Sequence, residues 1–435
     1  MKRTRVVVLV CFVFALILTS AGSVSADKMS SELTITNWDM DEHEPDVAYN
    51  SVHDEYFVVW WDNNGISFAV MAARYTAAGV FLGEYIIAYE TNPVRYNAEP
   101  SVAYDPVTDE YFVVWSRDYW GNESDYDVYG RYVPWDGPDG NHPVFAIDGA
   151  SGHQWDPRVA YNRSDNEFMV TWWNQSPAGS ADNISALRFQ AGGTAQGSVI
   201  IVTSDATQPR RYPDIAYNQA RNEYVIAYQR GVTGDTDVYG VRLRANGEIL
   251  GGGDFVIANW NNPEKSPRIA ASRTSNTWAV AWYSEITVTD NDVFACPVWV
   301  DGTGTVQVGT PVSPGSSSDD ENFPDISAHP ESSNYLVTWE AEYLGPGGNR
   351  GIWSQVVTSA GTLGARFRPR ELFIGESVDC TVPAVAGGVD DWMVVWQHRR
   401  DGTTYQDIHG RILFADVMAD GFESGDVTAW SSAVP

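Results

Sequence analysis

The sequence predicts an all-β fold, a seven-bladed β-propeller with four antiparallel strands in each blade. Three observations support this prediction: a strand pattern that occurs seven times, a unit length of 54 to 59 residues, and a chain that begins in the middle of a unit. A repeated four-strand unit is typical of propellers and of β-solenoids. The third observation favours the propeller.

The recurring strand is rich in aromatic and β-branched residues. Its first copy is Glu-Tyr-Phe-Val-Val-Trp at residues 55–60, and the later copies lie at residues 110–115, 167–172, 223–228, 277–282, 334–339 and 391–396. These runs lack the polar alternation of a strand with one face in water. We therefore expect each run to be the second strand of its blade and to be buried on both faces.

Each unit opens at a proline, and a short apolar strand follows it. These opening prolines are Pro45, Pro100, Pro157, Pro213, Pro267, Pro324 and Pro383. In the third strand of every unit the fourth position is small: Ala72, Gly130, Ala186, Gly240, Ala295, Ser354 and Gly410. A recurrent small residue in a strand indicates close approach of another group, and we expect the ring of the recurring tryptophan there.

The two ends of the chain complement each other. The seventh unit lacks a fourth strand after residues 410–414, whereas an unassigned strand lies before the first unit at residues 33–38. That strand aligns with the fourth strand at residues 255–260, and in both cases the opening proline lies seven positions after the last strand residue. We therefore predict that the N-terminal strand completes the last blade, which a β-solenoid would not require.

Residues 1–26 have the composition of a secretory signal. A basic start (Lys2, Arg3 and Arg5) precedes an apolar run at residues 6–18 and small residues before position 27. We predict cleavage before Asp27, a propeller over residues 27–417 and an acidic, flexible tail over residues 418–435. The alternative is a retained anchor, but the apolar run is shorter than the about 20 residues of a membrane span.

The charge and the cysteines limit the range of partners. The formal charge of −30 becomes −33 without residues 1–26, which hold three basic residues and no acidic ones. An acidic protein of this kind is not expected to bind nucleic acid or an anionic membrane, and we expect a secreted, soluble monomer. The remaining cysteines, Cys296 and Cys380, occupy different repeat positions, so no disulfide framework is indicated.

The repeat resembles a known group of proteins. Its Pro-x-Val-Ala-Tyr-Asn start, Glu-Tyr-x-Val-Val-Trp strand and Asp-Val-Tyr-Gly strand are similar to the units of secreted bacterial β-propeller proteins, most of which have no assigned activity. The resemblance covers about residues 33–414 and implies the fold. It implies no catalytic residues, and the Asp-box, Trp-Asp and double-glycine signatures of other propeller families do not occur in this chain.

Candidate binding residues lie in the loops that join one blade to the next. Glu44, Glu99 and Asp156 stand directly before the opening prolines of the first three units, and Tyr212 has this position in the fourth. We expect these residues to form one arc of the central mouth. The alternative is that they are ordinary solvated surface residues.

Aromatic residues in or beside the same loops could stack on sugar rings or pack over the blade edges. They are Trp38, Tyr96, Trp155 and Trp260. Asp-x-Asp pairs before the third strands could hold Ca²⁺ through carboxylate oxygens or cap turns. These pairs are Asp125 with Asp127, Asp235 with Asp237, and Asp290 with Asp292.

The residue after each opening proline forms a second pattern, in which Arg158, Asp214, Arg268 and Asp325 alternate in charge over four successive units. We expect these residues to pair with one another around the channel as a structural belt.

Two classes of function fit the sequence. We favour a non-enzymatic binding or scaffold propeller that engages a glycan or an extracellular protein. The alternative is a carbohydrate-active hydrolase or lyase that uses paired carboxylates at the central mouth.

Overall fold

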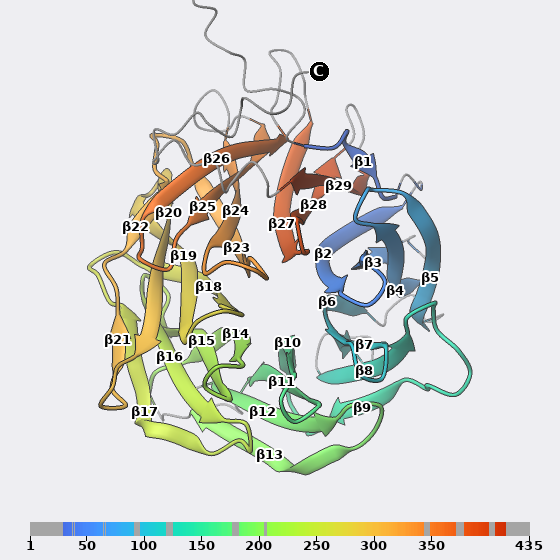
Figure 1. Ribbon diagram of the computed structural model, residues 1–435, viewed down its shortest axis with the longest axis horizontal. Coiled ribbons are helices and arrows are strands. Elements are labelled where there is room, and N and C mark those ends of the chain that lie inside the picture. Colours follow the sequence, from blue (N-terminus) through green and yellow to red (C-terminus); the bar gives the residue numbers. More distant parts are fainter. Residues whose placement is uncertain are drawn as a thin grey trace, which may run out of the picture.

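The computed structural model shows seven four-stranded antiparallel units arranged in a ring (Figure 1). The structure describes residues 29–36, 38, 40–63, 65, 67–90, 96–118, 125–175, 182–203, 207–342, 349–370, 378–399 and 405–414. The predicted signal segment and the predicted tail lie outside the described residues. Within the described ranges no residue is helical, and so none of these segments offers a helix that could cross a membrane.

The first three blades each use four consecutive strands, numbered from the channel outward. Blade one holds β2 (Asp41–Asn50), β3 (Glu55–Asn63), β4 (Phe68–Thr76) and β5 (Phe81–Glu90). Blade two holds β6 (Asn97–Asp105), β7 (Glu110–Asp118), β8 (Tyr126–Pro134) and β9 (Phe145–Asp148). Blade three holds β10 (Gln154–Asn162), β11 (Glu167–Asn174), β12 (Asn183–Gln190) and β13 (Ala195–Thr203).

The next three blades follow the same order. Blade four holds β14 (Arg210–Asn218), β15 (Glu223–Val232), β16 (Asp235–Arg244) and β17 (Ile249–Ala258). In blade five the outer strand is split, so that the blade holds β18 (Glu264–Ala271), β19 (Thr277–Thr287), β20 (Asp290–Val300), β21 (Val306–Val308) and β22 (Val312–Gly315). Blade six holds β23 (Glu321–Ala328), β24 (Tyr335–Glu342), β25 (Arg350–Val357) and β26 (Leu363–Arg370).

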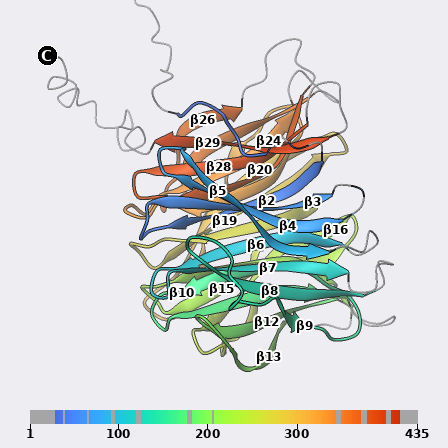
Figure 2. The same ribbon diagram turned by 90° about the vertical axis from the view of Figure 1, so that its right-hand side faces the viewer.

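The seventh blade is built from both ends of the chain, as predicted. Its first three strands are β27 (Asp379–Gly387), β28 (Asp391–Arg399) and β29 (Gln406–Phe414), and its outer strand is β1 (Leu33–Thr34). Leu33 pairs with Gly410, and the amides of Ile35 and Thr36 continue the contact to the carbonyl of Ile408. The N-terminal strand therefore closes the ring. Figure 2 shows the stacked blades from the side.

The second strands form the most deeply buried part of the protein. The six residues that open β3 are all buried, and the side chains of Trp115, Trp172 and Trp339 have no exposed surface. Neighbouring blades share these side chains, since the cluster around Tyr111 contains residues of blades one and two. Burial on both faces explains why the sequence shows no alternation in these strands.

The prediction about the small residue of the third strand is wrong in one respect. Gly130 and its equivalents are buried, but each pairs with the residue before the key aromatic, as Gly130 does with Val114. A Cβ atom on Gly130 would lie 2.8 Å from the ring of Phe112 and 2.9 Å from Ile147. At the three glycines of this set, Gly130, Gly240 and Gly410, the close neighbours are therefore atoms of the adjacent strands and not the recurring tryptophan.

Candidate functional site

Seven residues, one from each blade, surround one mouth of the central channel, and we call them the rim. Each stands directly before an opening proline: Glu44, Glu99, Asp156, Tyr212, Ser266, Phe323 and Val382. All seven have left-handed backbone conformations, with φ between 45° and 56°. Residues other than glycine seldom adopt this conformation, and it persists only where the surrounding structure imposes it.

A β-bulge in each innermost strand produces this conformation. In β2 the register shifts between His43 and Asp46, so that one extra residue is accommodated, and the same shift occurs in β6, β10, β14, β18, β23 and β27. Bulges bend a strand and turn its backbone groups away from their own ladder. The amides of the rim are therefore available to neighbouring blades.

Side chains of the preceding blade accept hydrogen bonds from these amides. The Glu99 N–H donates to Glu44 Oε2 (3.2 Å), and the Asp156 N–H donates to Glu99 Oε2 (2.8 Å). In other blades the acceptor is the residue after the key aromatic: Gln397 accepts from Glu44, Gln229 from Ser266, and Glu340 from Val382. Two of the predicted site residues thus join blades as well as facing the mouth.

The two glutamates are half-buried and held by further donors. The Trp61 indole N–H donates to Glu44 Oε2 (2.8 Å), and the Ser116 hydroxyl donates to Glu99 Oε2 (2.7 Å). No described residue donates a hydrogen bond to the Oε1 atom of either glutamate. Each carboxyl group therefore has one oxygen committed to the scaffold and one available to a ligand.

Burial and like charges favour the protonated forms of these groups. Burial raises the pKa of Glu99 to about 8, and the Asp156 and Glu44 carboxylates add to the effect. Burial also raises the pKa of Glu44, against the opposing hydrogen bond from Trp61. Asp156 is 5% exposed, and its Oδ1 lies 2.9 Å from the Arg158 guanidinium. The rim therefore combines a carboxyl group that holds a proton at neutral pH with an adjacent carboxylate in an ion pair.

Two aromatic rings lie on the rim with large exposed surfaces. Tyr212, which was among the predicted residues, is 40% exposed, and Phe323, which was not, is 43% exposed. Phe323 stands directly before the opening Pro324, and this repeat position could have predicted its place on the rim. The same signal also points to Ser266 and Val382, which complete the rim.

The structure does not bring the other four predicted aromatics to the channel. Trp38 is 52% exposed and interacts with Glu84, in the fourth strand of blade one. Trp260 packs against Phe294, with ring centroids 4.7 Å apart, in blade five.

Tyr96 packs against Phe68 (4.2 Å) in blade one, and Trp155 stacks on Tyr126 (3.9 Å) in blade two. All four of these predicted residues therefore pack against the third or fourth strand of a blade, and none is among the residues that line the channel. Packing against a blade was the structural alternative left open by the sequence.

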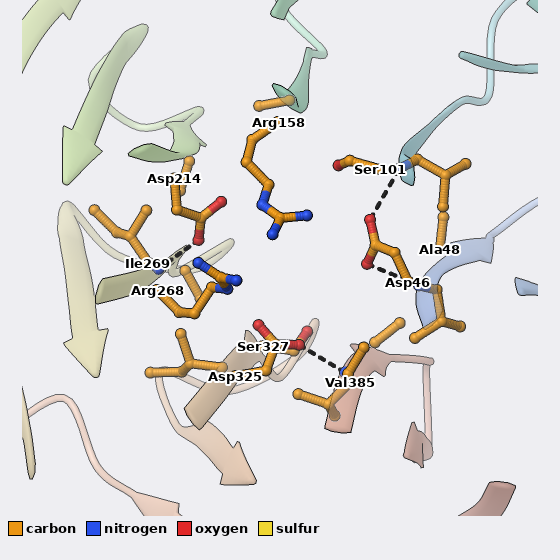
Figure 3. A pocket seen from close by; sticks show the side chains of 18 of the residues that line it. Asp46, Ala48, Ser101, Arg158, Asp214, Arg268, Ile269, Asp325, Ser327 and Val385 are labelled. Atoms are coloured by element: carbon orange, nitrogen blue, oxygen red, sulfur yellow. Dashed lines mark hydrogen bonds between the residues drawn. The ribbon is translucent and has the colours of Figure 1, made fainter. Parts of the chain in front are cut away.

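Below the rim, the residues that follow the opening prolines form the predicted belt, but its aspartates do not pair with its arginines. The Asp46 carboxylate accepts from the Val102 amide (2.9 Å), Asp214 from the Ile269 amide (2.7 Å), and Asp325 from the Val385 amide (2.7 Å) (Figure 3). Each of these bonds joins two blades. The belt is therefore structural, but through backbone amides and not through ion pairs.

The belt arginines point into the channel between these aspartates (Figure 3). Burial alone would lower the pKa of Arg158, but the carboxylates of Asp156 and Asp214 more than offset it and raise the pKa. Burial raises the pKa of Asp325 to about 7, although Arg268 opposes this effect. The acidic groups around the channel therefore stabilise the positive charge of Arg158.

The channel encloses about 590 Å³. Its lining runs from the rim, through the belt, to Arg163 and Arg273 beyond the opposite ends of the inner strands. Burial and the charge of Arg163 lower the pKa of Arg273 to about 10. The acidic rim and the basic far end make the two mouths chemically distinct.

A comparison with protein-family models gave no match for this chain. A comparison with the curated proteins gave none either.

Solved structures of similar shape do exist. A protein of unknown function from Dyadobacter fermentans has a TM-score of 0.51 at 10% identity, with 89% of this chain and 99% of that chain covered. The polysaccharide lyase Uly1 has a TM-score of 0.52 at 10% identity, covering 89% and 100% of the two chains.

An α-L-arabinofuranosidase mutant from Fusarium graminearum, solved with an iminosugar inhibitor, has a TM-score of 0.50 at 10% identity, covering 90% and 99%. At this level of identity the likenesses show a shared fold, and by its own topology this chain is a seven-bladed β-propeller.

Proposed function

We propose that the mature chain is an exported binding propeller that engages a glycan at the rim. The observation that supports this most directly is the composition of the mouth, where Glu44 and Glu99 each keep one oxygen free and Tyr212 and Phe323 expose their rings. Export rests on the composition of residues 1–26, which lie outside the described part of the chain.

The chemistry of the rim suits a sugar. Carboxyl groups exchange hydrogen bonds with hydroxyl groups, and an aromatic ring packs against the apolar face of a pyranose. The interblade hydrogen bonds fix the carboxyl groups of Glu44 and Glu99 before a ligand arrives. Such preorganisation lowers the entropic cost of binding.

The proposal draws on the rim itself, because the similar solved structures support the fold alone. A protein ligand is the competing partner within the same class of function. The negative charge of the mature chain and the acidic residues of the rim make nucleic acid an unfavourable ligand.

A glycan array followed by calorimetric titration of the best neutral and acidic oligosaccharides tests the proposal. Glu99→Gln and Tyr212→Ala should each weaken binding by about tenfold or more, which corresponds to about 1.4 kcal/mol. The matched controls are Glu248→Gln and Phe81→Ala, which change an exposed carboxylate and an exposed ring away from the rim. Equal affinities for the rim variants and the controls would exclude the rim as the site.

A second candidate function is glycan hydrolysis or elimination at the same rim. The observation in its favour is the pairing of Glu99, whose pKa burial raises to about 8, with the ion-paired Asp156. Adjacent carboxyl groups in different environments can serve as an acid and a base.

Incubation of the array hits with the protein separates the two functions. New reducing ends or unsaturated products that disappear in Glu99→Gln would establish catalysis. Binding without products would leave the binding function.

A further inference from the structure

Three carboxyl groups converge at the junction of blades five and six, and one of them, Glu321, stands two residues before the rim residue Phe323. Asp290 and Asp292 lie at the start of β20, and Glu321 opens β23 of the next blade. One ligand oxygen from each of the three residues lies within 4.8 Å of the others. The two aspartates form one of the Asp-x-Asp pairs in the sequence, but the glutamate comes from another blade.

Each of the three residues has one buried side-chain oxygen without a hydrogen-bond partner. Glu321 is only 2% exposed; its Oε1 accepts a hydrogen bond from the Ser317 hydroxyl (2.6 Å), whereas its Oε2 is buried with no partner. Asp290 Oδ1 and Asp292 Oδ1 are also buried with no partner. A buried carboxylate oxygen without a donor or a counter-charge is costly.

Arg366 approaches this cluster without forming an ion pair with it. The Glu321 carboxylate opposes the fall in the Arg366 pKa that burial causes, but the guanidinium lies over the rings of Trp353 and Trp339. Among the described residues, none forms an ion pair within 4.0 Å of Asp290, Asp292 or Glu321. The cluster of Glu32, His398 and His409 differs in this respect, because Arg370 and Arg411 approach Glu32 Oε2 at 3.7 and 4.0 Å. Glu32 of that second cluster therefore forms ion pairs with arginines, whereas the first cluster forms none among the described residues.

We propose that Asp290, Asp292 and Glu321 bind a Ca²⁺ ion that joins blades five and six. The available donors are all oxygens, which favours a hard cation over zinc or copper. Ca²⁺ takes six to eight oxygen ligands in flexible geometry, so three carboxylates, with the Ser317 hydroxyl and water, form a suitable set.

The other blade junctions supply natural comparisons. At the junction of blades four and five, Glu264 holds the position of Glu321, and it too has one oxygen bonded, to the Trp260 amide (3.2 Å), and one oxygen buried without a partner. Its neighbour Asp235 is exposed, however, and among the described residues Asp235, Asp237 and Glu264 do not converge as the three carboxyl groups of blades five and six do. At the junction of blades two and three, the Asp-x-Asp pair is present and Gln154 replaces the glutamate. A glutamine is therefore compatible with the fold at this position, which makes Glu321→Gln a suitable test variant.

Terbium luminescence provides a direct readout because a buried indole lies beside the cluster. A Cβ atom built on Gly315 would lie 2.8 Å from Trp339 Nε1 and 3.3 Å from Glu321 Cγ, so Trp339 and Glu321 border the same small space. We expect Tb³⁺ to show tryptophan-sensitised emission in the mature protein at physiological salt. Ca²⁺ should displace it, and Mg²⁺ should do so only at much higher concentration.

Calorimetric titration of Ca²⁺ and thermal melting complete the experiment. Ca²⁺ should raise the melting temperature of the wild type, because it binds only the folded state. Glu321→Gln and Asp292→Asn should each weaken Ca²⁺ binding by about tenfold or more and abolish the sensitised Tb³⁺ emission. The control Glu264→Gln should leave both signals unchanged.

Circular dichroism confirms that each variant is folded. Two results would overturn the proposal: the absence of Ca²⁺ binding and of Tb³⁺ emission in the wild type, or an equal loss in Glu264→Gln and Glu321→Gln. Loss of Ca²⁺ binding and of Tb³⁺ emission in both Glu321→Gln and Asp292→Asn, with both signals unchanged in Glu264→Gln, would establish the site.

Discussion

Replacing Glu99 by glutamine should stabilise the protein at alkaline pH and leave its stability unchanged at acid pH. Glu99 Oε2 accepts from the Ser116 hydroxyl (2.7 Å) and from the Asp156 amide (2.8 Å). A glutamine carbonyl oxygen can accept both bonds, so the substitution removes the charge and keeps the link between blades two and three.

The size and sign of the effect follow from the pKa of Glu99. Burial, then the carboxylates of Asp156 and Glu44, raise it from 4.5 to about 8. The folded protein therefore holds a proton that the unfolded chain has released, and the free energy of unfolding falls as the pH rises from about 4.5 to 8.

A shift of this size corresponds to about 5 kcal/mol above pH 8. Because Glu44 and Asp156 contribute to the shift, we expect Glu99→Gln to recover about 2–3 kcal/mol at pH 9 and nothing at pH 4.

Urea denaturation followed by tryptophan fluorescence measures this difference at several pH values and constant ionic strength. The control is Glu248→Gln, which removes an exposed carboxylate that pairs with Arg244 at 2.7 Å. That variant should follow the wild-type pH dependence. Parallel stability curves for wild type and Glu99→Gln between pH 4 and 9 would refute the burial of charge at the rim.

Three further predictions concern the scaffold. Trp115→Ala should lower the free energy of unfolding by about 3–5 kcal/mol because the side chain is fully buried. Trp38→Ala, at an exposed position, should lower it by less than about 1 kcal/mol. A fully stable Trp115→Ala variant would contradict the assigned core. Deletion of residues 27–39 should expose the edge of β29, which pairs with Leu33 and Thr34. The deletion should therefore lower the melting temperature by at least about 5 °C or cause aggregation. An unchanged melting curve would argue against closure by the N-terminal strand. Asp214→Ala should lower the free energy of unfolding by about 1–3 kcal/mol because it leaves the amides of Ile215 and Ile269 without their acceptor. Asp214→Asn should lower it by less. Equal losses of stability for the two variants in urea denaturation would show that the interblade hydrogen bond contributes nothing.

The sequence by itself determined the architecture. The spacing of Pro45 and its six equivalents defined the number of units, and the aromatic and β-branched runs identified the strands with two buried faces. The closure of the ring could also be predicted, because the sequence shows both that the last unit lacks a fourth strand and that an unassigned strand lies at residues 33–38. These features depend on local pattern and on repetition, and both are fully present in the amino-acid sequence.

The sequence could place Glu44, Glu99, Asp156 and Tyr212 on one arc, because equivalent repeat positions in a ring face the same mouth. It could not show that the Glu99 carboxyl accepts a hydrogen bond from an amide 57 residues away. Nor could it separate Trp38 and Trp260, which contact the outer strands β5 and β20, from Tyr212, which lies on the rim. Side-chain direction depends on which surfaces remain open after packing.

The belt and the acidic cluster depended most on the tertiary structure. Alternating arginines and aspartates suggested ion pairs, yet Asp214 and Asp325 accept from backbone amides in the innermost strands of neighbouring blades. Glu321 has no sequence link to Asp290 and Asp292, and only the packing of blade six against blade five brings the three carboxyl groups together. Hydrogen-bond partners and charge clusters between blades are set by the packing of the blades, and local sequence pattern does not encode them.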